Sequence, residues 1–357
     1  MRSVARALAG GAALAAAALL LLTGLLAVTG QSPAPALAAL WRGALGSPDA
    51  IISATLVRAT PLVLAGLAVA LAFRAGVLNV GAEGQLLIGA AAAAAVGGAL
   101  APTLGGVTVL AAVVAGMAAG ALWAGVAAVL RRRFGVLEVI STIMLNFVAL
   151  SVVGYLVRGP LQEPTHVYPQ SATLPPGARL PLLVPDSRLH VGFALAVAAA
   201  VGLWWTLRST AAGFRVRAVG LNPTAAASAG LIDVPRVTAR AFLASGALAG
   251  LAGAVEVTGV TFALYENLSP GYGYTAIAVA LLAALDPLGV VATGLLFGAL
   301  EAGASAMQRD AGVPASTVSV VEALLILLVL AAAPAAARLR ASFAASRRIP
   351  AGARRPA

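Results

Sequence analysis

Polar side chains interrupt the apolar sequence most clearly at residues 73–85 (FRAGVLNVGAEGQ). This segment places Asn79, Glu83 and Gln85 among three glycines, between two apolar runs. Irregular backbone at membrane depth is tolerated only where protein or a water-filled cavity satisfies its polar groups. A carboxylate beside such a break is a candidate for a solute pathway. The structural alternative is an ion pair between Glu83 and Arg74.

A second polar set lies at residues 138–146 (EVISTIMLN). Glu138, Thr142 and Asn146 are four residues apart, so on a helix they share one face. Because polar groups facing lipid are costly, we expect this face to point toward other helices. There it either lines the pathway or only bonds neighbouring helices.

A third segment, residues 213–230, carries the signals of a short helix. Asn222 suits the N-cap, Pro223 suits the first helical position, and Gly230 suits a left-handed C-cap. Alanines fill the body between them. A short helix at the membrane surface is what docking to a partner requires, and a routine connector is the alternative.

The composition excludes several kinds of chemistry. The chain contains 23 arginines and neither lysine nor cysteine, so it has no Walker A lysine, no disulfide and no thiolate nucleophile. His166 and His190 are its two histidines and fall in one polar connection. We therefore predict no catalytic residue, no metal site and no ATP hydrolysis by this chain. The arginines lie between apolar runs, which favours a membrane orientation signal over nucleic-acid binding.

The elements that must position these residues are membrane helices. Hydrophobic residues make up 61% of the chain and charged residues 10%, with a mean hydropathy of +0.98. We predict an all-α integral membrane protein with about ten transmembrane helices. The first apolar run is longer than a signal peptide's, so we expect a retained helix. The predicted spans are 7–28, 51–73, 83–100, 106–130, 138–157, 189–207, 238–260, 274–285, 288–306 and 317–334. Two of these, 83–100 and 274–285, are short enough to be re-entrant or broken.

Arginine counts predict the orientation. If the amino terminus is cytoplasmic, 17 of the 23 arginines lie inside, so both termini are predicted to be cytoplasmic. The permease domain is then 1–335, with an extracytoplasmic loop at 159–188, a cytoplasmic loop at 208–237 and a basic tail at 336–357. Seven prolines predict that the outer loop is stiff and mostly non-helical.

These segments resemble the permeases of ATP-binding-cassette (ABC) importers that serve simple sugars, nucleosides and branched-chain amino acids. The resemblance runs from about residue 55 to 330 and includes 272–282 and 286–289. Residues 73–85 and 138–146 are most similar to the nucleoside-uptake branch. The resemblance implies a multi-pass protein of the bacterial cytoplasmic membrane that translocates a small polar solute and holds no cofactor. ATP would be bound by a partner ABC subunit, and a second permease and an extracytoplasmic solute-binding lipoprotein are the other expected partners.

The resemblance also implies roles for individual residues. By position, a coupling loop that docks on the ATP-binding subunit would contain Arg215, Arg217, Gly220, Asn222, Ala225, Ala226 and Gly230. The expected substrate-pathway residues are Asn79, Glu83, Gln85, Glu138, Thr142 and Asn146. A nucleoside is the expected solute, with a ribose-like sugar or a branched-chain amino acid as alternatives.

A secondary transporter driven by an ion gradient is the competing class. It would need coupling carboxylates at the bilayer midplane, and often shows inverted repeats, which we do not find in this sequence. Glu256, Glu301 and Glu322 lie in apolar spans, but we expect structural partners for most of them. The small residues 246–250 and Gly253 predict close helix packing.

Overall fold

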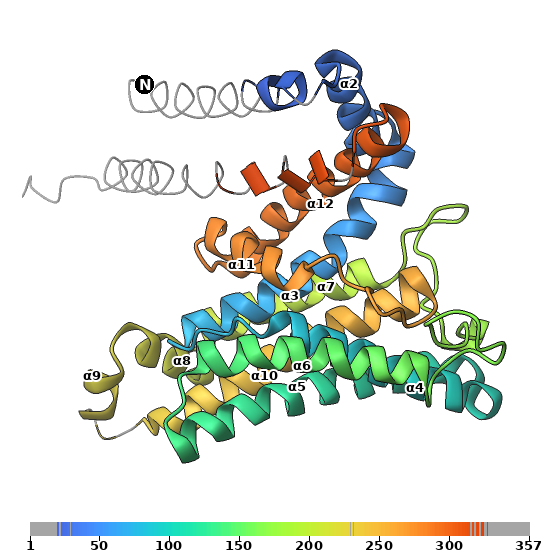
Figure 1. The fold of residues 1–357 in the computed structure, drawn as a ribbon. Helices are drawn as coiled ribbons and strands as arrows, with labels where there is room; N and C mark the ends of the chain where they lie inside the picture. Colours follow the sequence, from blue (N-terminus) through green and yellow to red (C-terminus); the bar gives the residue numbers. More distant parts are fainter. Residues whose placement is uncertain are drawn as a thin grey trace, which may run out of the picture. The chain divides into compact units, whose positions relative to one another are not determined.

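The computed structural model describes a helical protein. It describes residues 20, 23–28, 30–228, 230, 232–314, 316–317, 319–320, 323–324 and 327. Within these ranges helices are joined by turns and loops and no strand is formed, which confirms the all-α prediction (Figure 1). The α-helices are α2 (Pro33–Ala44), α3 (Leu56–Arg74), α4 (Ala82–Leu104), α5 (Thr108–Phe134), α6 (Glu138–Arg158), α7 (Gly192–Ser209), α8 (Ala211–Leu221), α9 (Pro223–Ser228), α10 (Val234–Glu256), α11 (Tyr272–Leu282) and α12 (Pro287–Asp310). Shorter π or 3₁₀ helices are η1 (Ala50–Thr55), η2 (Gly105–Val107), η3 (Pro176–Ala178) and η4 (Val257–Thr261).

The chain divides into two compact units. Unit 1 contains residues 1–41 and 303–357, and unit 2 contains residues 42–302. In the described part of unit 1, a small apolar core joins Leu26, Ala36 and Ala39 to Ala304, Met307 and Val313. The basic tail at 336–357 and most of the predicted spans 7–28 and 317–334 lie outside the described residues.

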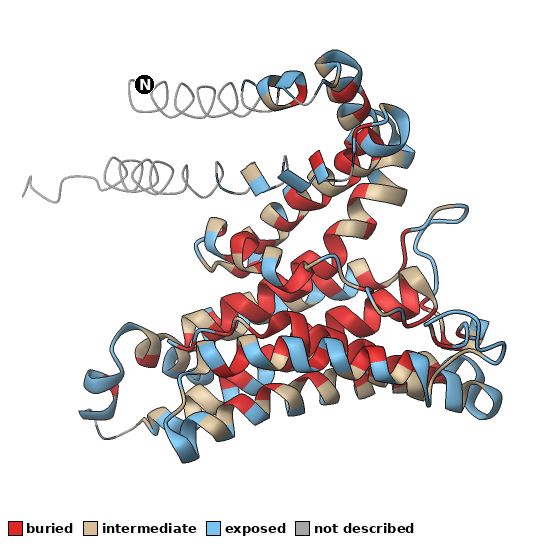
Figure 2. Ribbon diagram, viewed as in Figure 1, coloured by how far each residue is buried: buried red, intermediate tan, exposed pale blue. Residues whose placement is uncertain are grey.

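Helix α3 lies inside unit 2. It is apolar on every side and buried almost throughout, as expected of a helix surrounded by others. Helices α5 and α6 instead carry many exposed residues (Figure 2), among them large apolar side chains such as Leu122 and Phe147. Because water is a poor solvent for such a face, it suits contact with lipid.

Glycines let α4, α5 and α10 approach closely. A Cβ atom at Gly250 would clash with the carbonyl oxygen of Gly116, and one at Gly246 would lie 2.5 Å from that of Gly120. A Cβ atom at Gly253 would clash with the backbone of α4 at Leu86. The predicted close packing at 246–250 and Gly253 is therefore confirmed.

Six helical segments among the described residues are long and apolar enough to cross a membrane. They are Ala50–Arg74, Ala82–Phe134, Glu138–Arg158, Gly192–Ser209, Val234–Thr261 and Pro287–Asp310. The second contains both α4 and α5, which are separated by a turn at Gly105, whose φ is +52°. Helix α4 is continuous over 23 residues, so span 83–100 is not broken. The total of ten spans and the cytoplasmic termini stay predictions.

Helix α11 corresponds to span 274–285, the second of the two spans predicted to be re-entrant or broken. Its 11 residues rise about 16 Å, roughly half of a hydrocarbon core. The chain then turns through Ala284 and Leu285, both with positive φ, and enters α12, where Asp286 accepts a hydrogen bond from the Gly289 amide at 2.9 Å. Span 274–285 is thus a short helix ending in a break.

The proline-rich loop lies at the end of unit 2 opposite to α8 and α9 (Figure 1). It is non-helical except for η3, as predicted. Its backbone amides at Leu174 and Leu180 donate to the carbonyls of Phe262 (2.7 Å) and Thr258 (2.8 Å). These bonds attach the loop to η4 and to the residue that follows it.

Candidate functional site

Asn79 and Gln85 form a closed amide pair inside unit 2. The Asn79 Nδ2 donates to Gln85 Oε1 at 2.9 Å, and the Gln85 Nε2 donates to Asn79 Oδ1 at 3.0 Å. Asn79 also donates to Ser245 Oγ at 2.8 Å, and that hydroxyl donates to the Ala68 carbonyl at 2.6 Å. Both amides are buried, with 0% and 1% exposure. In this conformation the pair ties the 75–81 segment to α3, α4 and α10.

Asn146 holds the start of α4 from the side of α6. Its Oδ1 accepts from the Gly84 amide at 2.8 Å, and its Nδ2 donates to the Val80 carbonyl at 3.0 Å and to the Tyr274 hydroxyl at 3.3 Å. Thr142 lies one turn earlier and is also buried. For Thr142 and Asn146, the prediction that this face of α6 points toward other helices is therefore confirmed.

Glycines permit this contact between α6 and the start of α4. A Cβ atom at Gly81 would lie 2.8 Å from Thr142 Cβ, and one at Gly84 would lie 2.9 Å from Asn146 Oδ1. Both distances are far shorter than van der Waals contact, so larger residues at these positions would push the helices apart.

Glu83 bonds to the start of α11. Its Oε2 accepts from the Gly273 amide at 2.6 Å, and the Ser269 hydroxyl is a second partner. The alternative ion pair with Arg74 is wrong, because Arg74 instead donates to the Leu285 carbonyl at 3.1 Å. Arg74 therefore stabilises the break between α11 and α12.

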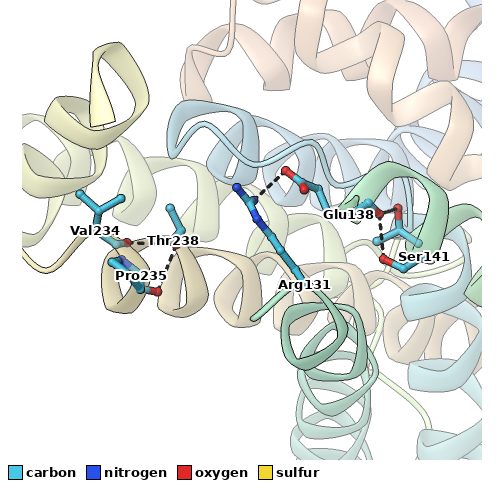
Figure 3. A network of polar contacts seen from close by, with 7 residues as sticks. Arg131, Glu138, Ser141, Val234, Pro235 and Thr238 are labelled. Atoms are coloured by element: carbon cyan, nitrogen blue, oxygen red, sulfur yellow. Dashed lines mark hydrogen bonds and ion pairs between the residues drawn. The ribbon is translucent and has the colours of Figure 1, made fainter. Parts of the chain in front are cut away.

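Glu138 differs from the other two residues of its face. It forms an ion pair with Arg131 at 2.7 Å (Figure 3), and its side chain is 13% exposed. Both residues line a cavity of about 510 Å³, together with Gly76, Gly220 and Thr238. The predicted polar face is thus split: Glu138 borders open space, whereas Thr142 and Asn146 are enclosed.

The predicted coupling segment contains two helices. Helix α9 begins as expected, because the Asn222 side chain accepts from the Ala225 amide at 3.0 Å and Pro223 is the first helical residue. Gly230 has the predicted positive φ, +72°. Helix α8 was not predicted; it is capped by Thr210, whose hydroxyl accepts from the Gly213 amide at 3.1 Å. Gly213 and Gly220 lower the helix propensity of these residues, so the pattern is a weak helix signal.

Gly220 joins this segment to the buried cluster. A Cβ atom at Gly220 would clash with the Arg74 carbonyl oxygen, and one at Gly76 would lie 3.4 Å from the Gly220 Cα. Gly76 also has a φ of +74°, which favours glycine. The end of α8 therefore packs directly on the segment that leads to Asn79 and Glu83.

The remaining predicted coupling residues lie on the outside of α8 and α9. Arg215 and Ala225 are exposed, Arg217 is half-buried, and Ala226 is buried at 6% exposure. The structure thus presents a mostly open surface around one buried alanine of α9.

Two hydrogen-bond partners of the predicted site residues, the buried Ser245 and the exposed Tyr274, were not predicted from the sequence. Ser245 lies beside the small residues 246–250, which indicated helix packing alone, and Tyr274 lies in α11 without a periodic polar pattern. Among the described residues, no group of three or more histidines and carboxylates is arranged to hold a metal ion.

The amino-acid sequence is similar to those of known proteins over most of its length. A family profile described as the branched-chain amino acid transport system / permease component matches residues 51–330. The chain is 40% identical to the guanosine ABC transporter permease protein NupP of Bacillus subtilis, covering 85% of this chain and 88% of NupP. It is 39% identical to the glucose ABC transporter permease protein TsgB13 of Haloferax volcanii, covering 78% and 76%. It is 31% identical to the nucleoside ABC transporter permease protein NupB of Lactococcus lactis, covering 81% of each. No solved structure matches the chain.

Proposed function

We propose that this chain, which belongs to the family of branched-chain amino acid transport system permease components, translocates a nucleoside across the bacterial cytoplasmic membrane. It is a multi-pass membrane transport component and not an enzyme, and it carries no cofactor. The observation that carries the choice of solute is the 40% identity to a guanosine permease over most of both chains. ATP would be hydrolysed by a partner ABC subunit.

A sugar is the second candidate solute. The glucose permease TsgB13 is only slightly less similar than NupP. A nucleoside contains a sugar ring, so both solutes offer hydroxyl groups to amide and carboxylate side chains. NupB, a third relative whose name specifies nucleosides, favours the nucleoside.

In this proposal α8 and α9 face the cytoplasm and receive the motion of the ATP-binding subunit. Gly220 passes that motion to the backbone at Arg74, because the two segments are in direct contact. The 75–81 segment then carries it to Asn79 and Glu83, whose partners lie on α4, α10 and the start of α11. If this contact can pack in two ways, a ligand that binds the partner subunit favours one of the two packings. That packing then sets the conformation of the pathway.

The pathway residues divide into two groups in this proposal. Glu138 borders the open cavity and would contact solute or water in the present conformation. Asn79, Glu83, Gln85, Thr142 and Asn146 are buried, so they would reach the solute only in the alternate conformation. A second permease would complete the pathway, and a lipoprotein would deliver solute from outside.

Transport assays test this function. The chain is reconstituted in proteoliposomes with the co-encoded ATP-binding subunit, second permease and binding protein, and radiolabelled guanosine uptake is measured against unlabelled glucose and leucine. We expect ATP-dependent guanosine uptake that glucose does not inhibit. Competition by glucose but not by other nucleosides would support the sugar instead. Uptake by the chain alone from a sodium or proton gradient would refute the ABC mechanism.

Two variants test the proposed roles. Ala226→Glu introduces charge at a buried position of α9, so we expect lost uptake with normal membrane insertion; Ala211→Glu, at an exposed position of α8, is the control.

Asn146→Leu removes three hydrogen bonds inside the bundle and should weaken uptake while the complex still assembles. If Asn146→Leu prevents assembly with the ATP-binding subunit, its role is structural.

A further inference from the structure

A second cavity lies on the outside of unit 2 near the end of α7. Its volume is about 390 Å³, and three of its seven lining residues are arginines. The lining residues are Arg74, Trp204, Leu207, Arg208, Arg217, Asp286 and Pro287. They come from α3, α7, α8 and the start of α12, so several elements of the fold build this one hollow.

Its charges do not balance. Arg74, Arg208 and Arg217 contribute three positive charges, against the one carboxylate of Asp286, which already caps α12 through the Gly289 amide. Among the described residues, no carboxylate oxygen lies within ion-pair distance of any of the three guanidinium groups. Arg74 is held in place by the Leu285 carbonyl. Like charges held around one hollow favour an anion inside it.

The cavity also lies at the end of a membrane span. Helix α7 is apolar and long enough to cross the membrane, and it ends at Ser209. Trp204 and Trp205 lie in its last turns, and Trp205 is 58% exposed. Tryptophan is enriched at the membrane–water interface, the depth at which lipid phosphates lie. The Arg208 guanidinium lies over the Trp204 ring, 5.2 Å from its centroid, which orients the arginine.

We propose that this cavity binds the phosphate group of an anionic phospholipid. Guanidinium groups bind phosphate oxygens in a planar, often bidentate arrangement, and three of them here come from different helices. The exposed indole of Trp205 places acyl chains beside α7 while the headgroup fills the hollow. Basic pockets between membrane helices are suited to such headgroups.

Native mass spectrometry of the assembled transporter tests this site. The complex is purified from nanodiscs of phosphatidylcholine with phosphatidylglycerol, and retained phosphatidylglycerol is measured. We expect Arg208→Gln to weaken retention about five-fold, the contribution of one arginine near an anionic surface. Arg208→Lys, which keeps the charge, should recover part of the loss. Arg240→Gln removes an exposed arginine of α10 outside the cavity and should change nothing.

Three outcomes would overturn the assignment. Equal retention by Arg208→Gln and Arg240→Gln would exclude a lipid at this cavity. Binding of inorganic phosphate in place of phosphatidylglycerol would mean that the anion is a free one. An effect of Arg208→Gln that appears as weaker attachment of the ATP-binding subunit, with lipid retention unchanged, would assign the cavity to an acidic protein surface. Because the readout is bound lipid, it does not depend on which solute is transported.

Discussion

The two ends of unit 2 are built differently. At the end with the proline-rich loop, backbone hydrogen bonds join the loop to the segment after α10, and His190 is completely buried. At the end with α8 and α9, the helices are mostly exposed and border a cavity of about 510 Å³. There the contact with the bundle includes bare glycine backbone at Gly76 and Gly220.

This difference indicates which end moves. Local opening costs little where few apolar contacts and many exposed backbone groups hold a segment. The loop end is therefore expected to act as a fixed cover, and the α8–α9 end as the element that shifts. The buried polar cluster lies between them and would change partners when the shift occurs.

Replacing Gly220 should have the largest effect. In Gly220→Ala the added methyl group clashes with the Arg74 carbonyl, so α8 must move away from the 74–76 backbone. Overpacking of about 1–3 kcal/mol corresponds to a change of about five- to 160-fold in a coupled equilibrium. We expect ATP-driven uptake to fall at least about five-fold, with membrane insertion unchanged.

The control for Gly220 is Gly202→Ala in α7, where an added Cβ has no neighbour within 4 Å. It should retain full uptake. If Gly220→Ala also transports normally, the contact with Arg74 does not carry the motion. The difference between the two ends would then not indicate which end moves.

The buried amide pair should respond next. Asn79→Leu leaves the Gln85 amide and the Gly81 N–H without their partner, and each buried unsatisfied group costs about 1–3 kcal/mol. We expect a clear fall in the melting temperature of the detergent-solubilised protein. The double variant Asn79→Leu/Gln85→Leu removes both amides and should be less destabilised than the sum of the single variants. Simple additivity would show that the two amides do not stabilise each other.

The buried His190 makes the stability of the loop end depend on pH. Burial lowers the pKa of His190 from 6.5 to about 4, so the folded protein holds it neutral while the unfolded chain protonates it. Above pH 6.5 His190 therefore does not lower the free energy of unfolding. As the pH falls toward 4, protonation of His190 in the unfolded chain lowers that free energy by at most about 3 kcal/mol. Thermal unfolding between pH 7 and 4 measures this loss.

A matched pair of variants isolates the histidine. His190→Phe cannot be protonated and should flatten the pH dependence, whereas His166→Asn, at an exposed position of the same loop, should leave it intact. An unchanged pH profile in His190→Phe would show that other groups cause the acid sensitivity.

Local signals were predictable from the sequence, and long-range partners were not. The Asn222 cap depends on residues three positions apart, and the Thr142–Asn146 face depends on helix periodicity, so both were predicted correctly. The bond from Asn79 to Ser245 and the contact of Gly220 with Arg74 join residues far apart in the chain. No local pattern encodes such pairs, because tertiary packing decides which helices meet. The alternative of a Glu83–Arg74 ion pair was wrong for the same reason.

The smallest expected effect compares one ion pair at each end. Glu138→Gln breaks the 2.7 Å pair with Arg131 beside the cavity, and Glu266→Gln breaks the 2.7 Å pair with Arg158 at the loop end. Both arginines are substantially exposed, so each loss should cost less than about 1 kcal/mol of stability. If only the α8–α9 end moves, Glu138→Gln should change the uptake rate two- to five-fold or so, roughly 0.5–1 kcal/mol, and Glu266→Gln should not. Equal changes in uptake would mean that both ends move during transport.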